Sequence, residues 1–392
     1  MEFFTPGSLK IDFMGKRNLW MSISACLVTL SLVVIIWRQV SGTLNWGVDF
    51  AGGTVIELEF KKEVPIEQVR KAVEQLGYEK SVIQHAFFAG KEGKVEYMIR
   101  VERIAILSDT DKVALESGLK EKFGQRLSFM RFDPDSGDQF ELMFAKSTDE
   151  SEIRDTLIEQ AQKLGKPELT NVKVRKEGKA KEQRYTVLMT GVAAQIEKEL
   201  KKKFTQEEPS VRKVEFVGPQ VGKKLRNDGI LSLVYALLGI LVYVGFRFNV
   251  LFSPGAVIAL FHDVIITVGL SALFRLEFNL TFVAAILTIV GYSINDTIVI
   301  YDRIRENIAR FKSQPLDKQM NIALNETLSR TINTSLVTFL SLMGLLFMGF
   351  GEIREFAIVM GIGIVFGTYS SIYIASALTQ VFDTWMKKIR PA

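Results

Sequence analysis

Residues 280–301 read LTFVAAILTIVGYSINDTIVIY, an apolar run that contains one acidic side chain, Asp296. A helix of about 20 residues crosses the roughly 30 Å of hydrocarbon in a bilayer, so the run is long enough for a transmembrane helix. A carboxylate in hydrocarbon costs about 3 kcal/mol, usually faces the interior of a helical bundle, and often serves a proton relay or an ion site. The run therefore predicts a membrane protein, and it makes Asp296 the first candidate for a functional residue. The alternative for Asp296 is a purely structural hydrogen bond.

Five more apolar runs of similar length predict a polytopic α-helical membrane protein with six transmembrane helices. The first, residues 19–37, follows basic residues but is too long for a typical signal sequence, so we expect a retained anchor. The other four are residues 229–246, 250–274, 331–350 and 356–382. The longer segments outside these runs are residues 1–18, 38–228, 302–330 and 383–392.

The basic residues indicate how these helices are oriented. Six spans place both termini on one side, and that side would hold most of the Lys and Arg outside residues 38–228. These residues are Lys10, Lys16, Arg17, Arg247, Arg303, Arg305, Arg310, Lys312, Lys318, Arg330, Lys387, Lys388 and Arg390. The short loops on the opposite side contain only Arg275 and Arg354. The positive-inside rule therefore makes both termini and residues 302–330 cytoplasmic and exports residues 38–228 to the periplasm or its equivalent.

The exported block has the charge density and periodicity of a soluble α+β domain. Its predicted strands are residues 54–60, 81–88, 95–104, 127–132, 139–145, 171–175, 184–189 and 211–217, and its predicted helices are residues 65–77, 109–123, 150–165 and 193–204. The order β-α-β-β-α-β thus occurs twice, which predicts two tandem ferredoxin-like units over about residues 54–133 and 139–218. Phe60 matches Phe144 and Val73 matches Leu157 at the same spacing, as in a duplication. The alternative is one larger α+β domain.

The composition does not point to an enzyme. The net charge of +5 reflects orientation in the membrane rather than nucleic-acid binding, and the single cysteine, Cys26, allows no disulfide or cysteine-based metal site within the chain. The exported block contains no nucleophile elbow and no phosphate-binding loop. We therefore expect no catalytic site, metal or cofactor.

Two further positions could act together with Asp296. Arg330 opens the fifth apolar run at the cytoplasmic end, and a cation near a carboxylate favours the charged form while burial opposes it. Such a pair can be switched by protonation, although Arg330 could instead be a positive-inside anchor. His262 and Asp263, near the middle of the third run, either extend the relay or bond to another helix.

Three passages resemble the SecF family of bacterial protein-export subunits: GVDFAGGT at residues 47–54, VGPQVG at residues 217–222, and GYSINDTIVIYDRIREN at residues 291–307. The glycines of the first passage fit a close approach of two backbones, and Gly218 with Pro219 fits a stiff turn. The positions that carry the resemblance are Gly47, Asp49, Gly52, Gly53, Gly218, Pro219, Gly291, Asn295, Asp302 and Arg303.

The resemblance implies a half-transporter of the RND type in the bacterial inner membrane. It implies association with SecD, the SecYEG channel, YajC and the translocating polypeptide, within membrane lipid and without nucleic acid. It also implies use of the proton gradient, with Asp296 and Arg330 at the family's functional positions. SecF proteins usually carry one small exported domain, so the two units expected here depart from the pattern.

The leading hypothesis is a proton-driven subunit for protein export. One alternative is half of a proton-coupled RND exporter of small molecules, although such exporters usually have twelve spans in one chain. The other is a scaffold that holds export components without using energy.

Overall fold

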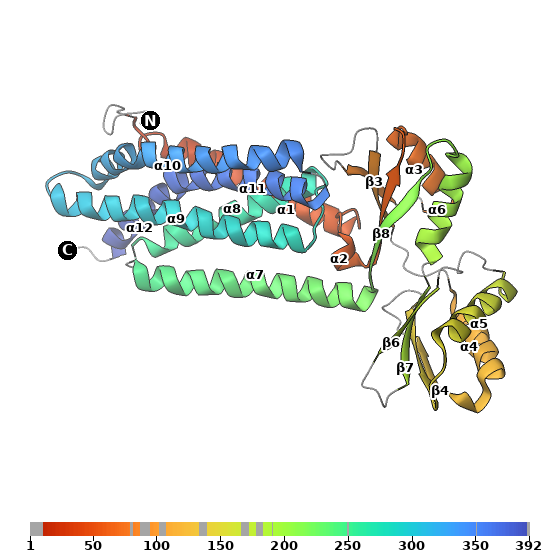
Figure 1. Cartoon of the computed structure of the whole chain (residues 1–392). Coiled ribbons are helices and arrows are strands. Elements are labelled where there is room, and N and C mark those ends of the chain that lie inside the picture. Colours follow the sequence, from red (N-terminus) through yellow and green to blue (C-terminus); the bar gives the residue numbers. More distant parts are fainter. Residues whose placement is uncertain are drawn as a thin grey trace. The chain divides into compact units, whose positions relative to one another are not determined.

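The computed structural model describes residues 11–78, 81–86, 95–101, 107–132, 139–165, 172–177, 183–189, 191–248, 251–349 and 351–389. The chain divides into a membrane unit, Met1–Asn45 with Asn227–Ala392, and a second unit, Trp46–Arg226. The second unit contains most of the block that we expected to be exported, and we name it the exported unit for that expectation. Figure 1 shows long helices in the first unit and small sheets covered by helices in the second.

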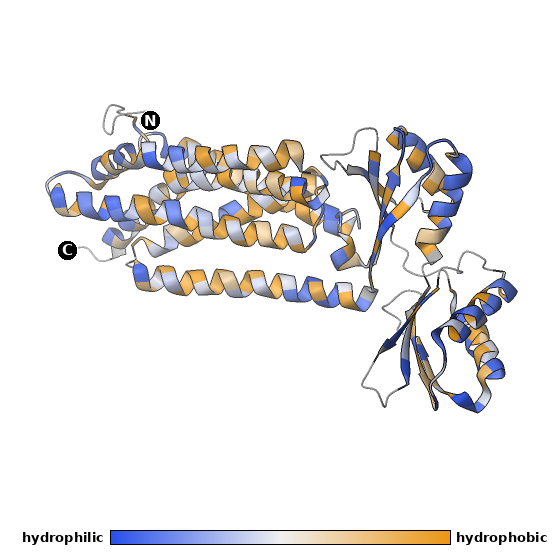
Figure 2. Cartoon of the chain, viewed as in Figure 1, coloured by the Kyte–Doolittle hydropathy of each residue, from blue (hydrophilic) through white to orange (hydrophobic). Residues whose placement is uncertain are grey.

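Within the described residues, six long, apolar helical segments form the membrane unit, which confirms the predicted polytopic fold. They are α1 (Arg17–Val40), α7 (Pro219–Arg247), α8 (Ser253–Leu273), α9 (Leu280–Arg310), α10 (Leu316–Met348), and α11 (Gly351–Ser370), which continues through a π-helical segment, η3 (Ser371–Ala375), into α12 (Ser376–Ile389). Figure 2 shows hydrophobic residues along most of each segment and hydrophilic residues toward the ends.

Burial separates central helices from peripheral ones. Within their most apolar windows, α8, α9 and the α11–α12 segment each bury 56% of the residues, whereas α1 and α7 bury only 11%. Glycines let the central helices approach closely, as expected for small residues between transmembrane helices. A Cβ on Gly363 would overlap Ile289 of α9, and one on Gly367 would lie 3.2 Å from the Cβ of Ser293. Polar groups on α8, α9 and α11 are therefore shielded from lipid.

Residues 302–330, which we expected to be a loop, are mostly helical. Helix α9 continues to Arg310 and α10 begins at Leu316, so only a short turn joins them. Hydropathy identifies the apolar part of a helix and misses a polar extension. Here the extensions are stabilised by a hydrogen-bonded ion pair of 2.8 Å from Arg303 to Glu326 and by a bond of 3.0 Å from Asn307 to the same carboxylate.

In the described part of the exported unit, the strands form two four-stranded antiparallel sheets. The first has the order β2-β3-β1-β8 and the second the order β4-β5-β7-β6. The strands are β1 (Gly53–Phe60), β2 (Val82–Ala86), β3 (Val95–Val101), β4 (Leu127–Phe132), β5 (Gln139–Phe144), β6 (Val172–Glu177), β7 (Arg184–Met189) and β8 (Ser210–Val217). The helices are α2 (Val48–Ala51), α3 (Ile66–Glu74), α4 (Asp109–Phe123), α5 (Glu150–Lys163) and α6 (Gly191–Lys203).

The two predicted units are present, but their last helix and strand are exchanged. Strand β8 pairs with β1, with Ile56 opposite Val214, while β4 pairs with β5, with Phe132 opposite Phe140. Helix α6 accordingly lies with α3 and β8, and α4 lies with α5 and β4. The boundaries at residues 54–133 and 139–218 are thus corrected: each sheet combines three strands of one repeat with the fourth strand of the other.

The exchange can be tested by disulfide formation in a Cys26→Ser background. Residues 55 and 215 are direct partners on β1 and β8, so cysteines at Val55 and Glu215 should cross-link readily under oxidising conditions. A tandem arrangement would instead place β4 beside β1. Cysteines at Val55 and Phe129 should therefore remain reduced, and a cross-link in this second pair, detected as a mobility shift, would contradict the exchanged topology.

Candidate functional site

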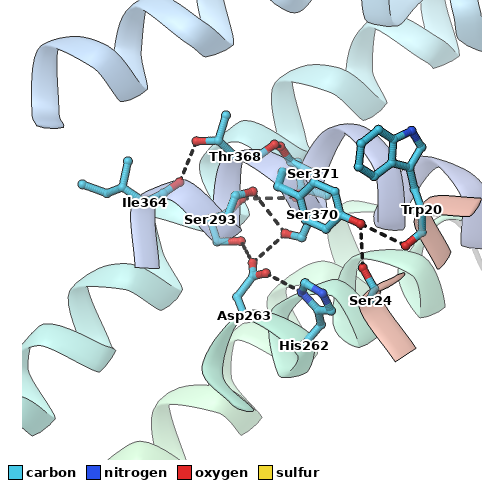
Figure 3. A network of polar contacts seen from close by, with 12 residues as sticks. Trp20, Ser24, His262, Asp263, Ser293, Ile364, Thr368, Ser370 and Ser371 are labelled. Carbon is cyan, nitrogen blue, oxygen red and sulfur yellow. Dashed lines mark hydrogen bonds and ion pairs between the residues drawn. The ribbon is translucent and has the colours of Figure 1, made fainter. Parts of the chain in front are cut away.

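The carboxylate of Asp263 lies at the centre of a polar network that joins three central helices (Figure 3). Asp263 on α8 is fully buried, and its Oδ2 accepts hydrogen bonds from Ser293 of α9 at 2.5 Å and from Ser370 of α11 at 2.7 Å. Its Oδ1 lies 2.9 Å from Nδ1 of His262. A buried carboxylate needs such partners because burial removes it from bulk water. Asp263 therefore links α8, α9 and α11 through side chains.

A second layer connects this network to α1. The hydroxyl of Tyr369, next to Ser370 in sequence, donates to the carbonyl of Trp20 at 2.9 Å and lies 2.8 Å from the hydroxyl of Ser24. The ring of Tyr369 is also 6.1 Å from that of His262. In the part of the chain that the structure describes, Nε2 of His262 is buried and has no hydrogen-bond partner. The network thus reaches from α9 to α1 around α8.

Asp296 is buried on the same helix as Ser293, about one turn further along. Only 4% of the residue is exposed, and its Oδ2 has no hydrogen-bond partner among the described residues. Buried polar atoms in native proteins are nearly always satisfied, so an unsatisfied carboxylate oxygen in a membrane helix calls for a functional explanation. Asp263 is held by several donors, whereas Asp296 retains an oxygen that is free to gain a partner.

Arg330 lies on α10, and its side chain is exposed. Within the described ranges no ion pair of 4.0 Å or less joins it to Asp296. The partnership of these two residues stays a prediction. Thr331, the next residue, is 1% exposed and its hydroxyl also lacks a partner in the described part of the chain.

Further along α10 from Arg330, hydroxyl contacts connect this helix to α9 and α11. The hydroxyl of Ser335 lies 2.6 Å from that of Thr368 on α11, and the hydroxyl of Tyr292 on α9 lies 3.3 Å from that of Thr338. Hydrogen bonds between side chains are a common source of attraction between transmembrane helices. A shift of α10 would change these contacts together with the distance from Arg330 to Asp296.

The other residues that we singled out on α9 do not join this site. Asp302 pairs with Arg247 at 2.5 Å and Arg303 with Glu306 at 2.7 Å, at the end of the helix that extends beyond the apolar run. Gly291 and Asn295 are exposed on the surface of α9. These positions fix the end of the helix or face outward.

The two glycine-containing passages near the exported sheets lie against each other. Gly52 and Gly53, at the start of β1, have φ values of +80° and +141°, which favour glycine. A Cβ on Gly222 would lie 3.0 Å from the backbone nitrogen of Gly52 and 3.2 Å from the carbonyl oxygen of Asp49. The passages at residues 47–54 and 217–222 thus meet backbone to backbone.

Comparison with known proteins identifies the family. Residues 195–385 match the family model of the SecD/SecF C-terminal region, a protein export membrane protein, and residues 42–64 match the model of the SecD/SecF GG motif. The protein translocase subunit SecF of Koribacter versatilis is 35% identical over 98% of this chain and 94% of its own length. The chain belongs to the SecD/SecF family.

Fused relatives and solved structures agree with this assignment. A SecDF protein of Brucella abortus is 49% identical over 45% of this chain and 23% of its own length. The crystal structure of SecDF from Thermus thermophilus, described as a translocon-associated membrane protein, is 28% identical, with a TM-score of 0.60 over 96% of this chain and 39% of that chain. The chain therefore spans about two fifths of the length of that fused protein.

The family relationship confirms several expectations. The chain is a SecF-type subunit of the Sec protein-translocation machinery, hence a transport protein rather than an enzyme. It is a multi-pass membrane protein, and its SecF relatives imply the inner membrane.

Sequence reasoning found Asp263 and Asp296, which are buried within membrane helices, but not the groups that hold Asp263. Ser370 and Tyr369 lie in a long apolar segment, where single hydroxyl residues are common and carry no periodic signal. The adjacent pair Ser370 and Ser371, at the start of the π-helical segment, was the available sign, since π-helical turns often occur at functional sites.

We expect the Asp263 network to contribute measurably to stability. Asp263→Leu would leave the hydroxyl of Ser293 without its acceptor, at a cost of about 1–3 kcal/mol, whereas Ser370 can still donate to the carbonyl of Gly367 at 3.1 Å. Asp263→Asn keeps a carbonyl oxygen for the two serines and should lose less. Thermal unfolding of the purified full-length variants in one detergent would measure the difference. Equal midpoints for wild type and Asp263→Leu would show that the network does not hold the helices together.

Proposed function

We propose that this chain uses the proton gradient to assist the movement of polypeptides across the inner membrane, with Asp296 as the residue that binds and releases the proton. One observation carries the proposal. Asp296 is buried in a central membrane helix, and within the described ranges one of its carboxylate oxygens has no hydrogen-bond partner. Such an arrangement is costly in hydrocarbon and is retained where protons or ions pass.

Protonation of Asp296 would alter the force between α9 and α10. The charged carboxylate attracts Arg330, and the neutral acid does not. Because Ser293 on α9 is bonded to Asp263, which also accepts from Ser370, a displacement of α9 would be shared with α8 and α11. The polar network around Asp263 would thus convert a local change of charge into a movement of several helices.

The proposed orientation has both termini in the cytoplasm and the exported unit on the opposite side. The distribution of Lys and Arg supports this orientation. The chain connects the exported sheets to the membrane helices over very short distances in sequence. Strand β8 ends at Val217 and α7 begins at Pro219, while only α2 and its flanking residues separate α1 from β1. A movement of α1 or α7 could therefore reach the sheets without a long linker to absorb it.

One face of α9 supports association with a second membrane protein, which we propose to be SecD. Ala284, Thr288, Gly291 and Asn295 recur at helical spacing, are exposed, and offer small or polar side chains. Small residues allow close packing of helices, and an Asn that faces lipid is unfavourable. Relatives in which SecD and SecF are fused fit this partner. Association with SecYEG and YajC rests on the family resemblance.

Protein export into inverted membrane vesicles tests the proton-binding role. Vesicles with Asp296→Asn as the only copy should export at the wild-type rate measured without a gradient, because the amide cannot carry the charge. Glu306→Gln is a matched control, since Glu306 is exposed at the end of the same helix. It should keep the stimulation by the gradient. Full stimulation in Asp296→Asn, with normal insertion, would favour a scaffold without energy coupling.

A second pair of variants tests whether the charge of Arg330 is sufficient. Since no close ion pair joins Arg330 to Asp296 among the described residues, Arg330→Lys should retain most of the gradient-dependent export. Arg330→Gln should lose it. Equal export by the two variants, measured by protection of the substrate from protease, would exclude an electrostatic role for Arg330.

A further inference from the structure

An apolar groove opens on the side of the membrane unit between α1, α8 and the η3–α12 segment. It has a volume of about 290 Å³, and its walls include Ala25, Ile258, Phe261 and Leu378. Ile258 and Phe261 are each 43% exposed. The three walls belong to helical segments that can cross a membrane, so the groove lies where lipid acyl chains are the surrounding solvent.

Two basic residues, Lys16 and Arg17, come directly before the α1 wall of the groove in sequence. Met21, in the α1 wall, is one helical turn from Arg17, which opens the helix. Arg17 donates through Nη1 to Gln380 of α12 at 2.9 Å, so a polar contact bridges the two helices beyond Met21. A guanidinium has five N–H donors, and this bond uses one of them. Lys16, the preceding residue, is exposed.

We infer that the groove binds an anionic phospholipid, with one acyl chain between α1, α8 and α12 and the phosphate at Lys16 and Arg17. This inference goes beyond the proposed function and does not depend on it. An apolar groove with Arg17 one helical turn beyond its α1 wall, and Lys16 next to Arg17 in sequence, matches the two parts of such a lipid. Basic pockets between transmembrane helices are known to bind anionic headgroups. In the orientation proposed above, the lipid belongs to the cytoplasmic leaflet.

The position of the groove gives the lipid a link to the polar network. His262, whose Nδ1 lies 2.9 Å from Asp263, forms part of the groove wall, and so does Ser24, whose hydroxyl meets that of Tyr369. A bound acyl chain would therefore lie against the residues that hold Asp263 in place. A transmembrane helix of a partner could also fill an apolar groove, but it would not need Lys16 and Arg17.

Native mass spectrometry of the full-length protein, titrated with phosphatidylglycerol or phosphatidylcholine of identical acyl chains, tests the inference. Wild type should bind phosphatidylglycerol more tightly than phosphatidylcholine, by about fivefold for each basic residue that contacts the phosphate. Arg17→Gln should lose about that factor, and Arg17→Lys should retain it. Ala25→Phe, at an exposed wall position, should weaken binding of both lipids by filling the groove. Lys318→Gln and Val337→Phe, at exposed positions of α10, should leave binding unchanged.

Three results would overturn the inference. The first is equal binding of the two lipids by wild type, which would indicate a nonspecific apolar surface or a site for a protein partner. The second is unchanged binding in Ala25→Phe, which would place the lipid elsewhere. The third is a loss in Arg17→Lys as large as in Arg17→Gln, which would assign Arg17 to its bond with Gln380 rather than to a phosphate.

Discussion

The bilayer core offers no water to a buried carboxylate, and the arrangement of the membrane helices follows from that constraint. Asp263 is completely enclosed, and it is stabilised because α8, α9 and α11 each place a polar side chain beside it. Each of those helices must then keep its position along the membrane normal and its rotation about its own axis. A displacement would leave the carboxyl group or a hydroxyl in hydrocarbon without a hydrogen-bond partner. The glycines facing α9 make the required closeness possible. The acid thus fixes the register of the helices that surround it.

Asp263 and Asp296 are both buried in membrane helices but have different surroundings, so they suit different roles. The oxygens of Asp263 are occupied by neighbours from three helices, which favours one fixed arrangement. Asp296 lies on the same helix as one of those neighbours but, within the described ranges, retains an unsatisfied oxygen. A protein that couples protons to movement needs both a stable core and a group whose partners can change. The proposed function assigns the first property to Asp263 and the second to Asp296.

Local patterns in the sequence were sufficient for the helices and strands but not for their connections. Apolar length identified the six membrane helices, because the cost of crossing hydrocarbon adds up residue by residue along one segment. Alternation identified β4 and β8 equally well, and for that reason it could not tell which of β1 and β5 each would join. The same limit applies to the site. A lone Asp in an apolar run is conspicuous, whereas the serine that bonds to Asp263 from a distant helix resembles any other serine.

The exchanged strands make the exported unit one interdependent structure. The first sheet lacks an edge until β8 is present, and β8 is the last strand of the unit to be synthesised. Pairing β1 with β8 closes a very long loop, so this contact forms late and slowly. The second sheet needs no strand beyond β7, whereas the first lacks its edge strand until β8 has been synthesised. The free edge of β1 therefore stays open to another extended segment while the rest of the unit is being made.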